Sequence, residues 1–265
     1  PNVRFQEDPV RMLRACEFAA RLGFGIEDRT QEAILANREE LTKASPARMT
    51  EEVIQLLRCK HAGPAIQWML DLRLVEVLLP EVQEILESPR SGFGDFRGIL
   101  PAIDRLMTRD EPASDSALLA AILLPRVWIQ RCRREAEEGH PLSRATIEEI
   151  IRQGVEPFLS RFALSNAKSA AVVDALIGFH RMCEPQWTPA AQARFARRRL
   201  FADALFLFLV MVEATREGQE VLEIWQRAGE KPWPGPEEPT ATPRPRRRRR
   251  RRGRSRHSQT PGEGI

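Results

Sequence analysis

One carboxylate and two arginines, Asp8, Arg11 and Arg14, are spaced three residues apart near the start of the chain. On a helix this spacing places the three side chains roughly along one face. A carboxylate accepts hydrogen bonds and a guanidinium donates them in a planar fork, so the set could read the polar edge of a flat ligand or hold a phosphate. We expect Asp8 to cap this helix and Pro9 to take its first position. The alternative interpretation is a cap with a surface ion pair.

The two arginines are not explained by helix stability. Positive charges in the first turns oppose the helix dipole, by roughly a few tenths of a kcal/mol each at an exposed position. Position 11 would also suit Glu or Gln better, because these residues complete a capping box. The pattern therefore favours a binding role for Arg11 and Arg14.

The residues around this set, 5–15 (FQEDPVRMLRA) and 18–24 (FAARLGF), resemble the neck-domain motif of the class II nucleotidyltransferases. This family comprises bacterial poly(A) polymerases and CCA-adding enzymes. Its motif aspartate and the arginine three residues later form Watson–Crick-like hydrogen bonds with the base of the incoming nucleotide. The resemblance implies this role for Asp8 and Arg11, with Arg14 nearby for orientation or for the triphosphate. One departure is Glu17, where the family usually has arginine.

A second pair, Arg48 and Glu52, lies four residues apart on a helix that we expect to begin after Ser45 and Pro46. In the same family an Arg-x-x-x-Glu motif on a neck helix supports the nucleotide-binding helix. The resemblance, which continues to about residue 83, implies that Arg48 and Glu52 give this support here. The alternative is a surface ion pair worth roughly 0.3–0.5 kcal/mol.

The sequence contains no pattern for a catalytic metal site. Nucleotidyl transfer uses two divalent metal ions held by clustered carboxylates, and the family holds them on a G-S-x-x-D-x-D segment of an N-terminal α/β head. Neither this segment nor H-E-x-x-H or G-x-S-x-G occurs here. We expect no catalytic or metal-binding residue in this chain. The complete enzyme would use Mg²⁺ and ATP, and this chain alone would be inactive.

Helical patterns fill the sequence to about residue 228, and the alternating Val, Ile and Thr runs of strands are missing. An all-α fold is predicted: a multi-helix array that corresponds to the neck and body of the family. The expected domains are a neck-like helical domain with the base-recognition motif (1–88), a helical body that binds RNA (89–228) and a disordered Arg-rich tail (229–265).

Five further positions receive structural predictions. Phe18, Leu22 and Phe24 are expected in the core, and Gly23 is expected to end the first motif helix. His180 lies on an apolar helix and is expected to be structural rather than a ligand.

The positive charge of the chain is concentrated at its end. Ten arginines and one glutamate follow Pro243, a net charge of +9, whereas the whole chain carries only +4. The preceding part is therefore mildly acidic. An uninterrupted arginine run suits a polyanion partner, and no aromatic residue interrupts it to stack on bases. The residues expected to bind RNA without reading its sequence are Arg246, Arg247, Arg248, Arg249, Arg250, Arg251 and Arg252.

Together these features predict the C-terminal part of a poly(A) polymerase-like enzyme that adds AMP from ATP to RNA 3′ ends. The chain would supply nucleotide selection and RNA binding. Its basic tail resembles the tails of some bacterial poly(A) polymerases, and this resemblance favours polyadenylation over CCA addition. A CCA-adding enzyme and a non-catalytic helical RNA-binding module are the alternatives. The expected partners are RNA 3′ ends and ATP, with no membrane. Four widely separated cysteines suggest reduced thiols and a cytoplasmic location.

Overall fold

The computed structural model describes residues 1–87, 96–184 and 187–230, which form α-helices and one 3-10 helix without any strand. The predicted all-α fold is confirmed for this part of the chain. The helices in chain order are α1 (Asn2–Glu7), α2 (Arg11–Leu22), α3 (Asp28–Asn37), the 3-10 helix η1 (Arg38–Lys43), α4 (Pro46–Arg58), α5 (Ala62–Asp71), α6 (Leu74–Leu78), α7 (Pro80–Glu87), α8 (Phe96–Thr108), α9 (Asp115–Glu138), α10 (Arg144–Arg161), α11 (Asn166–Met182), α12 (Pro189–Phe195), α13 (Phe201–Thr215) and α14 (Gln219–Glu230).

Two of the predicted domain features fall outside the described residues. The boundary between residues 88 and 89 lies in the first gap, and the arginine tail lies beyond residue 230. Both stay predictions. The described helices belong to one compact unit, Pro1–Lys231. Within the described ranges, none of the helices has the length and apolar character needed to cross a membrane.

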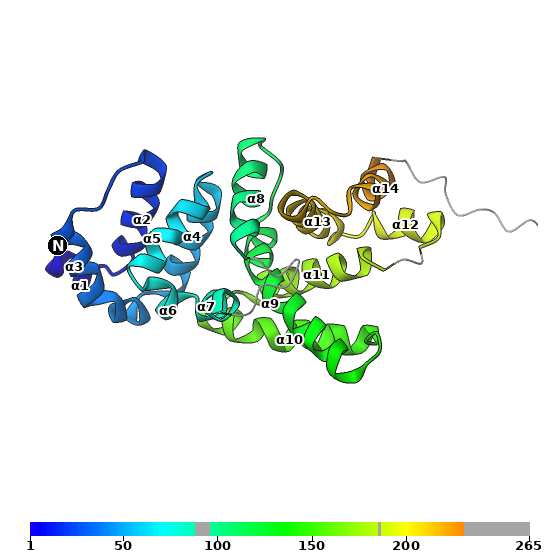
Figure 1. The fold of residues 1–265 in the computed structure, drawn as a ribbon, viewed down its shortest axis with the longest axis horizontal. Helices are drawn as coiled ribbons and strands as arrows, with labels where there is room; N and C mark the ends of the chain where they lie inside the picture. The colour runs from blue at the N-terminus through cyan, green and yellow to red at the C-terminus, as the bar shows by residue number, and fades with distance from the viewer. Residues whose placement is uncertain (88–95, 185–186, 231–265) are drawn as a thin grey trace, which may run out of the picture. The chain divides into compact units, whose positions relative to one another are not determined.

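Helix α2 is the centre of the N-terminal helices. Its buried side chains are spaced at helical intervals and include Met12, Leu13, Cys16 and Ala19, so one face of the helix enters the core. That face packs against α5 and α4, which lie beside it in Figure 1. Gly23 ends the helix in the left-handed conformation that glycine adopts at low cost, as predicted.

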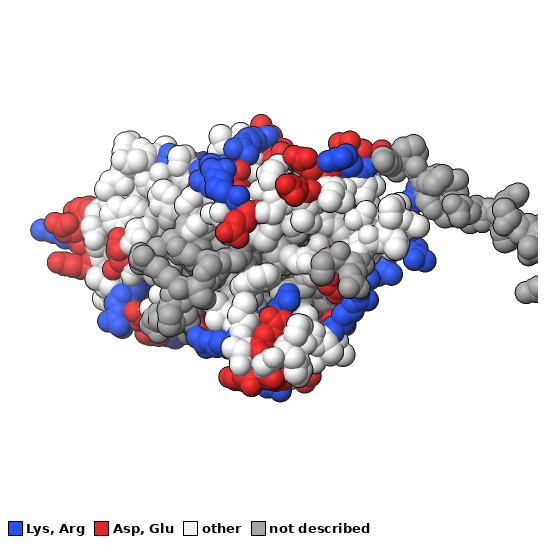
Figure 2. Space-filling view, turned by 45° about the vertical axis from the view of Figure 1, so that its right-hand side comes forward, with Lys and Arg blue, Asp and Glu red and all other residues white. Residues whose placement is uncertain are grey.

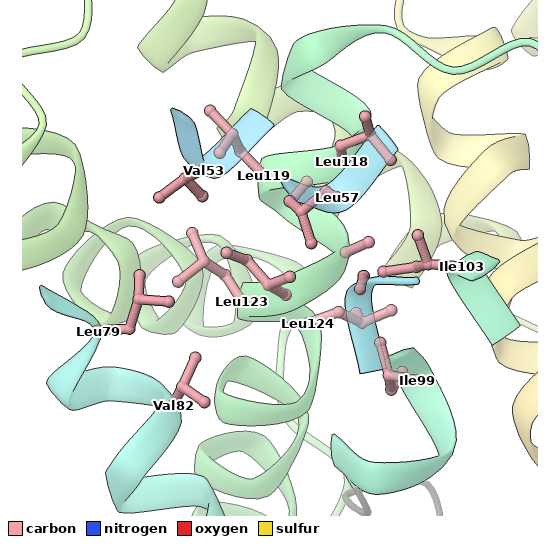
Figure 3. Packing of buried hydrophobic residues seen from close by; sticks show 14 of the residues in the cluster. Val53, Leu57, Leu79, Val82, Ile99, Ile103, Leu118, Leu119, Leu123 and Leu124 are labelled. Carbon is pink, nitrogen blue, oxygen red and sulfur yellow. The ribbon is translucent and has the colours of Figure 1, made fainter. Parts of the chain in front are cut away.

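The long helix α9 joins the N-terminal helices to the rest of the unit. Almost all of its first fifteen residues are buried, because α4, α7, α8, α10, α11 and α13 all contact it. Figure 3 shows the apolar side chains of four helices and the α6–α7 junction pointing toward one another in this region. The labelled residues are Val53 and Leu57 of α4, Leu79 before α7, Val82 of α7, Ile99 and Ile103 of α8, and Leu118, Leu119, Leu123 and Leu124 of α9.

A buried ion pair fastens α7 to α10. The Glu81 carboxylate on α7 is 3% exposed and accepts a hydrogen bond from each terminal nitrogen of Arg161 on α10, both at 2.7 Å. Arg126 on α9 lies 3.9 Å from the same carboxylate. The bidentate geometry offsets the cost of removing the two charges from water.

Aromatic side chains hold the C-terminal helices together. Rings of Trp187, Phe195, Phe201 and Trp225 contact one another with centroids 5.1–6.2 Å apart. The Trp225 indole also donates to the Met182 carbonyl at the end of α11, at 3.2 Å. Helices α11, α12, α13 and α14 are therefore anchored around one aromatic cluster.

His180 on α11 is buried, as predicted for a structural histidine. Its ring stacks on Trp128, and its Nδ1 accepts from Arg131 at 3.2 Å, which leaves the proton on Nε2. That Nε2 is buried with no hydrogen-bond partner among the described residues. Burial, followed by the charge of Arg131, lowers the pKa of His180 from 6.5 to about 3.

This histidine should make stability depend on pH. Between about pH 6.5 and pH 3 the unfolded chain binds a proton at His180 and the folded chain does not, so acidification favours unfolding by up to ~1.4 kcal/mol per pH unit. Replacing His180→Gln should flatten the slope of unfolding free energy between pH 6.5 and 5, measured with urea. The exposed His140, changed to Gln, is the control and should keep the slope. Equal slopes in the His180 variant and the wild type would contradict the assignment.

Candidate nucleotide-recognition site

The Asp8 side chain does not cap α2, and Pro9 does not take its first position, so both predictions are wrong. Helix α2 begins at Arg11, while Asp8 follows the short helix α1, which the sequence pattern did not indicate, and donates its backbone N–H to the Arg4 carbonyl. The carboxylate is turned instead toward two cations. Arg48 Nη2 of α4 donates to Asp8 Oδ2 at 3.0 Å, and Arg11 Nε lies 3.4 Å from the same oxygen. Hydrogen bonds from charged guanidinium groups are stronger than those from the neutral backbone amides at the start of a helix.

Asp8 is therefore an ionised acceptor held in place from two helices. Its side chain is only 19% exposed, and burial alone would raise its pKa. The hydrogen bond and charge of Arg48, with the charge of Arg11, outweigh burial and lower the pKa of Asp8 below 3.8. Both contacts are made to Oδ2, and no side-chain hydrogen bond reaches Oδ1 among the described residues, so Oδ1 keeps its capacity to accept one.

Arg48 and Glu52 of α4 contact the residues of the first predicted set, Asp8 and Arg14. No ion pair joins Arg48 to Glu52 among the described residues; each contacts α2 instead. Arg48 binds Asp8, and one turn further along α4 the Glu52 carboxylate lies 4.0 Å from Arg14 Nε. The structure thus brings together all five residues that the sequence singled out in this region: Asp8, Arg11, Arg14, Arg48 and Glu52.

An open groove of about 420 Å³ continues from this set between α2 and α4. Its lining carries both signs of charge and consists of Arg14, Glu17, Phe18, Arg21, Glu51, Glu52 and Gln55. Burial, opposed by the charge of Arg14 and assisted by that of Glu17, raises the pKa of Glu52 above 4.5. The groove therefore holds two carboxylates close enough to influence each other.

The departure from the family pattern, Glu17, is accommodated within α2. Its side chain is buried, and its Oε1 lies 3.3 Å from Arg21 Nε one turn later. That oxygen has no hydrogen bond of good geometry among the described residues. Arg21 thus neutralises the carboxylate without fully satisfying it.

Three side chains expected in the core are on the surface instead. Phe18 is 38% exposed, Leu22 53% and Phe24 66%. The buried face of α2 is already taken by the stripe that begins at Met12, and Phe18 lies off that stripe. Its ring is covered by guanidinium groups, with the Arg14 and Arg21 carbons 5.7 and 4.9 Å from its centroid. Cation–π contacts of this kind keep an exposed ring in place.

Two other predictions concern the arginine tail and metal binding. The seven tail arginines lie beyond residue 230. In the described ranges, no three His, Cys, Asp or Glu side chains gather in a way that could hold a metal ion.

A second group of arginines lies at the other end of the unit, around α12. Arg194, Arg198 and Arg199 are exposed, and Arg181 at the end of α11 is half-buried. In Figure 2 blue side chains gather on the right-hand side, the side on which Figure 1 draws α12. The sequence signal for this group is the arginine triplet at 197–199, in a stretch without any acidic residue between Glu184 and Asp203.

Comparison with known proteins finds relatives of this chain, and the family model that matches it covers residues in its N-terminal part. Residues 23–86 match the family model described as the probable RNA and SrmB-binding site of polymerase A. The CCA-adding enzyme of Oceanobacillus iheyensis is 39% identical over 127 residues, which are 48% of this chain and 30% of that enzyme. The CCA-adding enzyme of Bacillus subtilis is 41% identical over 78 residues, 29% of this chain and 20% of that enzyme. Poly(A) polymerase I of Escherichia coli O157:H7 is 38% identical over 82 residues, 31% of this chain and 18% of that enzyme.

These matches confirm the resemblance to the bacterial poly(A) polymerases and CCA-adding enzymes. They span less than a third of the length of each of these relatives. Both activities occur among the relatives, so similarity supports a nucleotidyltransferase part that binds RNA without choosing between the two.

Proposed function

We propose that this chain supplies nucleotide selection and RNA binding for an enzyme that adds AMP from ATP to RNA 3′ ends. The observation that carries the proposal is the Asp8 carboxylate, fixed by Arg11 and Arg48 with one oxygen left to accept. Asp8 and Arg11 occupy the two motif positions that read the base in the resembled family.

The chemistry of recognition follows from the donors and acceptors. Adenine presents an amine donor beside a ring-nitrogen acceptor. The Asp8 oxygen would accept from the amine, and the Arg11 guanidinium, 45% exposed at its side chain, would donate to the ring nitrogen. Uracil presents a carbonyl acceptor and an N–H donor at these positions. Its carbonyl would face the Asp8 acceptor and its N–H would face the Arg11 donor, so neither hydrogen bond could form. A site built this way rejects the wrong base because the carboxylate of Asp8 and the guanidinium of Arg11 are left unpaired.

The arginine and glutamate of α4 have positioning roles in this proposal. Arg48 orients the Asp8 carboxylate, and Glu52 restrains Arg14 from the adjacent turn. Arg14, half-exposed beside the groove, would be left to orient the nucleotide or contact its triphosphate.

Catalysis itself is assigned to a different segment. The described residues do not offer a carboxylate set that fits Mg²⁺ ions, and we derive no step through a metal. We assign the Mg²⁺ ligands and the transfer of AMP to a head with the G-S-x-x-D-x-D segment. A protein that carries such a head together with this chain is called the head-containing protein below.

RNA binding is assigned to the helical body and to the seven arginines at 246–252. Polycationic segments bind RNA through its phosphates and lose affinity steeply with salt. All four cysteines are free, which agrees with the cytoplasmic location that we propose.

The second candidate, CCA addition, is favoured by the 127-residue match to the Oceanobacillus iheyensis enzyme. Incubating the head-containing protein with a general RNA and with tRNA lacking CCA, offering each nucleotide separately, distinguishes the two. Long adenylate tails on both RNAs are expected. Addition confined to tRNA, using CTP before ATP, would establish the alternative. RNA binding without transfer of any nucleotide would support the third alternative, a non-catalytic RNA-binding module.

A further inference from the structure

The arginines around α12 form a group that we call the α12 arginine cluster: Arg181, Arg194, Arg198 and Arg199. None of the four has a carboxylate within ion-pair distance among the described residues. Elsewhere in the unit arginines are typically paired, as Arg48 is with Asp8, Arg161 with Glu81 and Arg105 with Glu213. The cluster is therefore a positive surface without an ion pair among the described residues, and the charges of Glu184 and Glu148 offset that of Arg181 only from a longer distance.

Arg181 is held rigidly within this surface. Its guanidinium carbon lies 5.5 Å from the Trp187 ring centroid and 5.3 Å from that of Phe195. The Trp187 indole donates to the Arg181 carbonyl at 2.9 Å, which fixes the ring relative to the end of α11. Two aromatic rings thus orient the guanidinium in advance of any ligand.

The donors of Arg181 are unused within the described structure. Its side chain makes no hydrogen bond there, and its Nε is buried without a partner. Burial, followed by the charges of Arg198 and Arg144, lowers the pKa of Arg181 below its usual 12.5. Arg144 is itself bound to Glu184, so that carboxylate is already engaged. A partly buried cation with like charges nearby and no acceptor is the arrangement that an external anion would stabilise.

The burial of Phe195 beside the cluster favours phosphate over bases as the ligand. Phe195 is buried among Trp187, Phe201 and Trp225, so its faces are not open for a base to stack. What the surface presents is planar, forked donors, whose geometry matches phosphate oxygens.

We propose that the α12 arginine cluster binds phosphates of the RNA backbone, as an anchor separate from the nucleotide-recognition site. It lies outside the residues that match the family model. The identification of RNA as the source of the phosphate rests on the proposed function. The cluster would hold the strand by its charge, without regard to base sequence.

Binding of the full chain to a fluorescent adenylate 20-mer, without nucleotide and at increasing salt, tests this site. Each phosphate contact on a single strand contributes ~0.7 to the log–log slope. Changing Arg194→Ala and Arg198→Ala together should therefore reduce the slope by ~1.4. Both side chains are exposed, so the unfolding midpoint should not move. The same reduction should appear in a chain whose seven tail arginines are serine, where the tail cannot compensate.

The matched control removes two other exposed arginines, Arg29→Ala and Arg152→Ala, which also lack ion pairs among the described residues. Its slope should stay at the wild-type value. Equal slopes in the cluster and control variants would overturn the proposal. So would displacement of the RNA by inorganic phosphate at an equal concentration of phosphate groups, because the site would then bind the free anion. Loss of ATP selectivity with intact RNA binding bears on the proposed function and not on this site.

Discussion

Replacing Arg11→Ala in the head-containing protein should lower the preference for ATP over UTP by roughly 5- to 150-fold. This range corresponds to the about 1–3 kcal/mol that a good polar contact with a base edge contributes to discrimination. The Arg11 guanidinium lies beside the Asp8 carboxylate and is half-exposed, so its loss removes a donor from the reading edge. The ratio of kcat/KM for the two nucleotides, on one RNA substrate, measures the effect.

The control for this variant is Arg29→Ala, which removes an exposed arginine of α3. It should leave the nucleotide preference unchanged, and both variants should bind RNA like the wild type. An Arg11 variant that keeps the full preference for ATP would show that this arginine does not read the base.

Replacing Arg161→Ala should lower the free energy of unfolding by about 3–5 kcal/mol, the cost of leaving a buried charge without its partner. Glu81 would lose both of its 2.7 Å hydrogen bonds. Arg126, 3.9 Å away, would compensate in part, so the lower end of the range is expected. Urea unfolding followed by circular dichroism measures the change.

A matched control is Arg227→Ala in α14. Its ion pair with Glu223 spans 3.3 Å but both side chains are more than half exposed, so the loss should stay within ~0.5 kcal/mol. Similar losses in the Arg161 and Arg227 variants would mean that the α7–α10 ion pair does not stabilise the fold.

Local signals in the sequence predict the helices well. The Ser143 and Thr188 hydroxyls accept from the backbone amides three residues later, which is the cap that serine and threonine commonly form at the start of a helix. Gly23 ends α2 in the left-handed conformation. In each case the partner lies within five residues, so the neighbouring sequence contains all the information that the structure uses.

Asp8 and Phe18 show where such signals fail. A carboxylate before a helix is a good cap only when nothing stronger competes, and Arg48 is forty residues away in sequence. Phe18 is hydrophobic, but which face of α2 is buried depends on how α4 and α5 pack against it. The short helix α1 has no side-chain cap, so the sequence contains no capping signal from which it could be predicted.

The two candidate sites also differ in how far the sequence predicts them. The residues of the recognition site could be singled out from spacing and resemblance, and the structure adds that Arg48 and Glu52 act on α2 rather than on each other. For the α12 arginine cluster the sequence offers only the arginine triplet at 197–199, because the role of Arg181 depends on its lying beside Phe195, which follows it by more than ten positions. The nucleotide-binding roles themselves remain proposals.

The most direct test of base reading pairs a change in the protein with a change in the ligand. In the head-containing protein, kcat/KM is measured for ATP and for an ATP analogue without the exocyclic amine, using the wild type and Asp8→Ala. If the Asp8 oxygen accepts from that amine, the wild type should prefer ATP by roughly 5- to 150-fold and the variant should use both nucleotides equally. An Asp8 variant that still prefers ATP to the same degree would contradict the account.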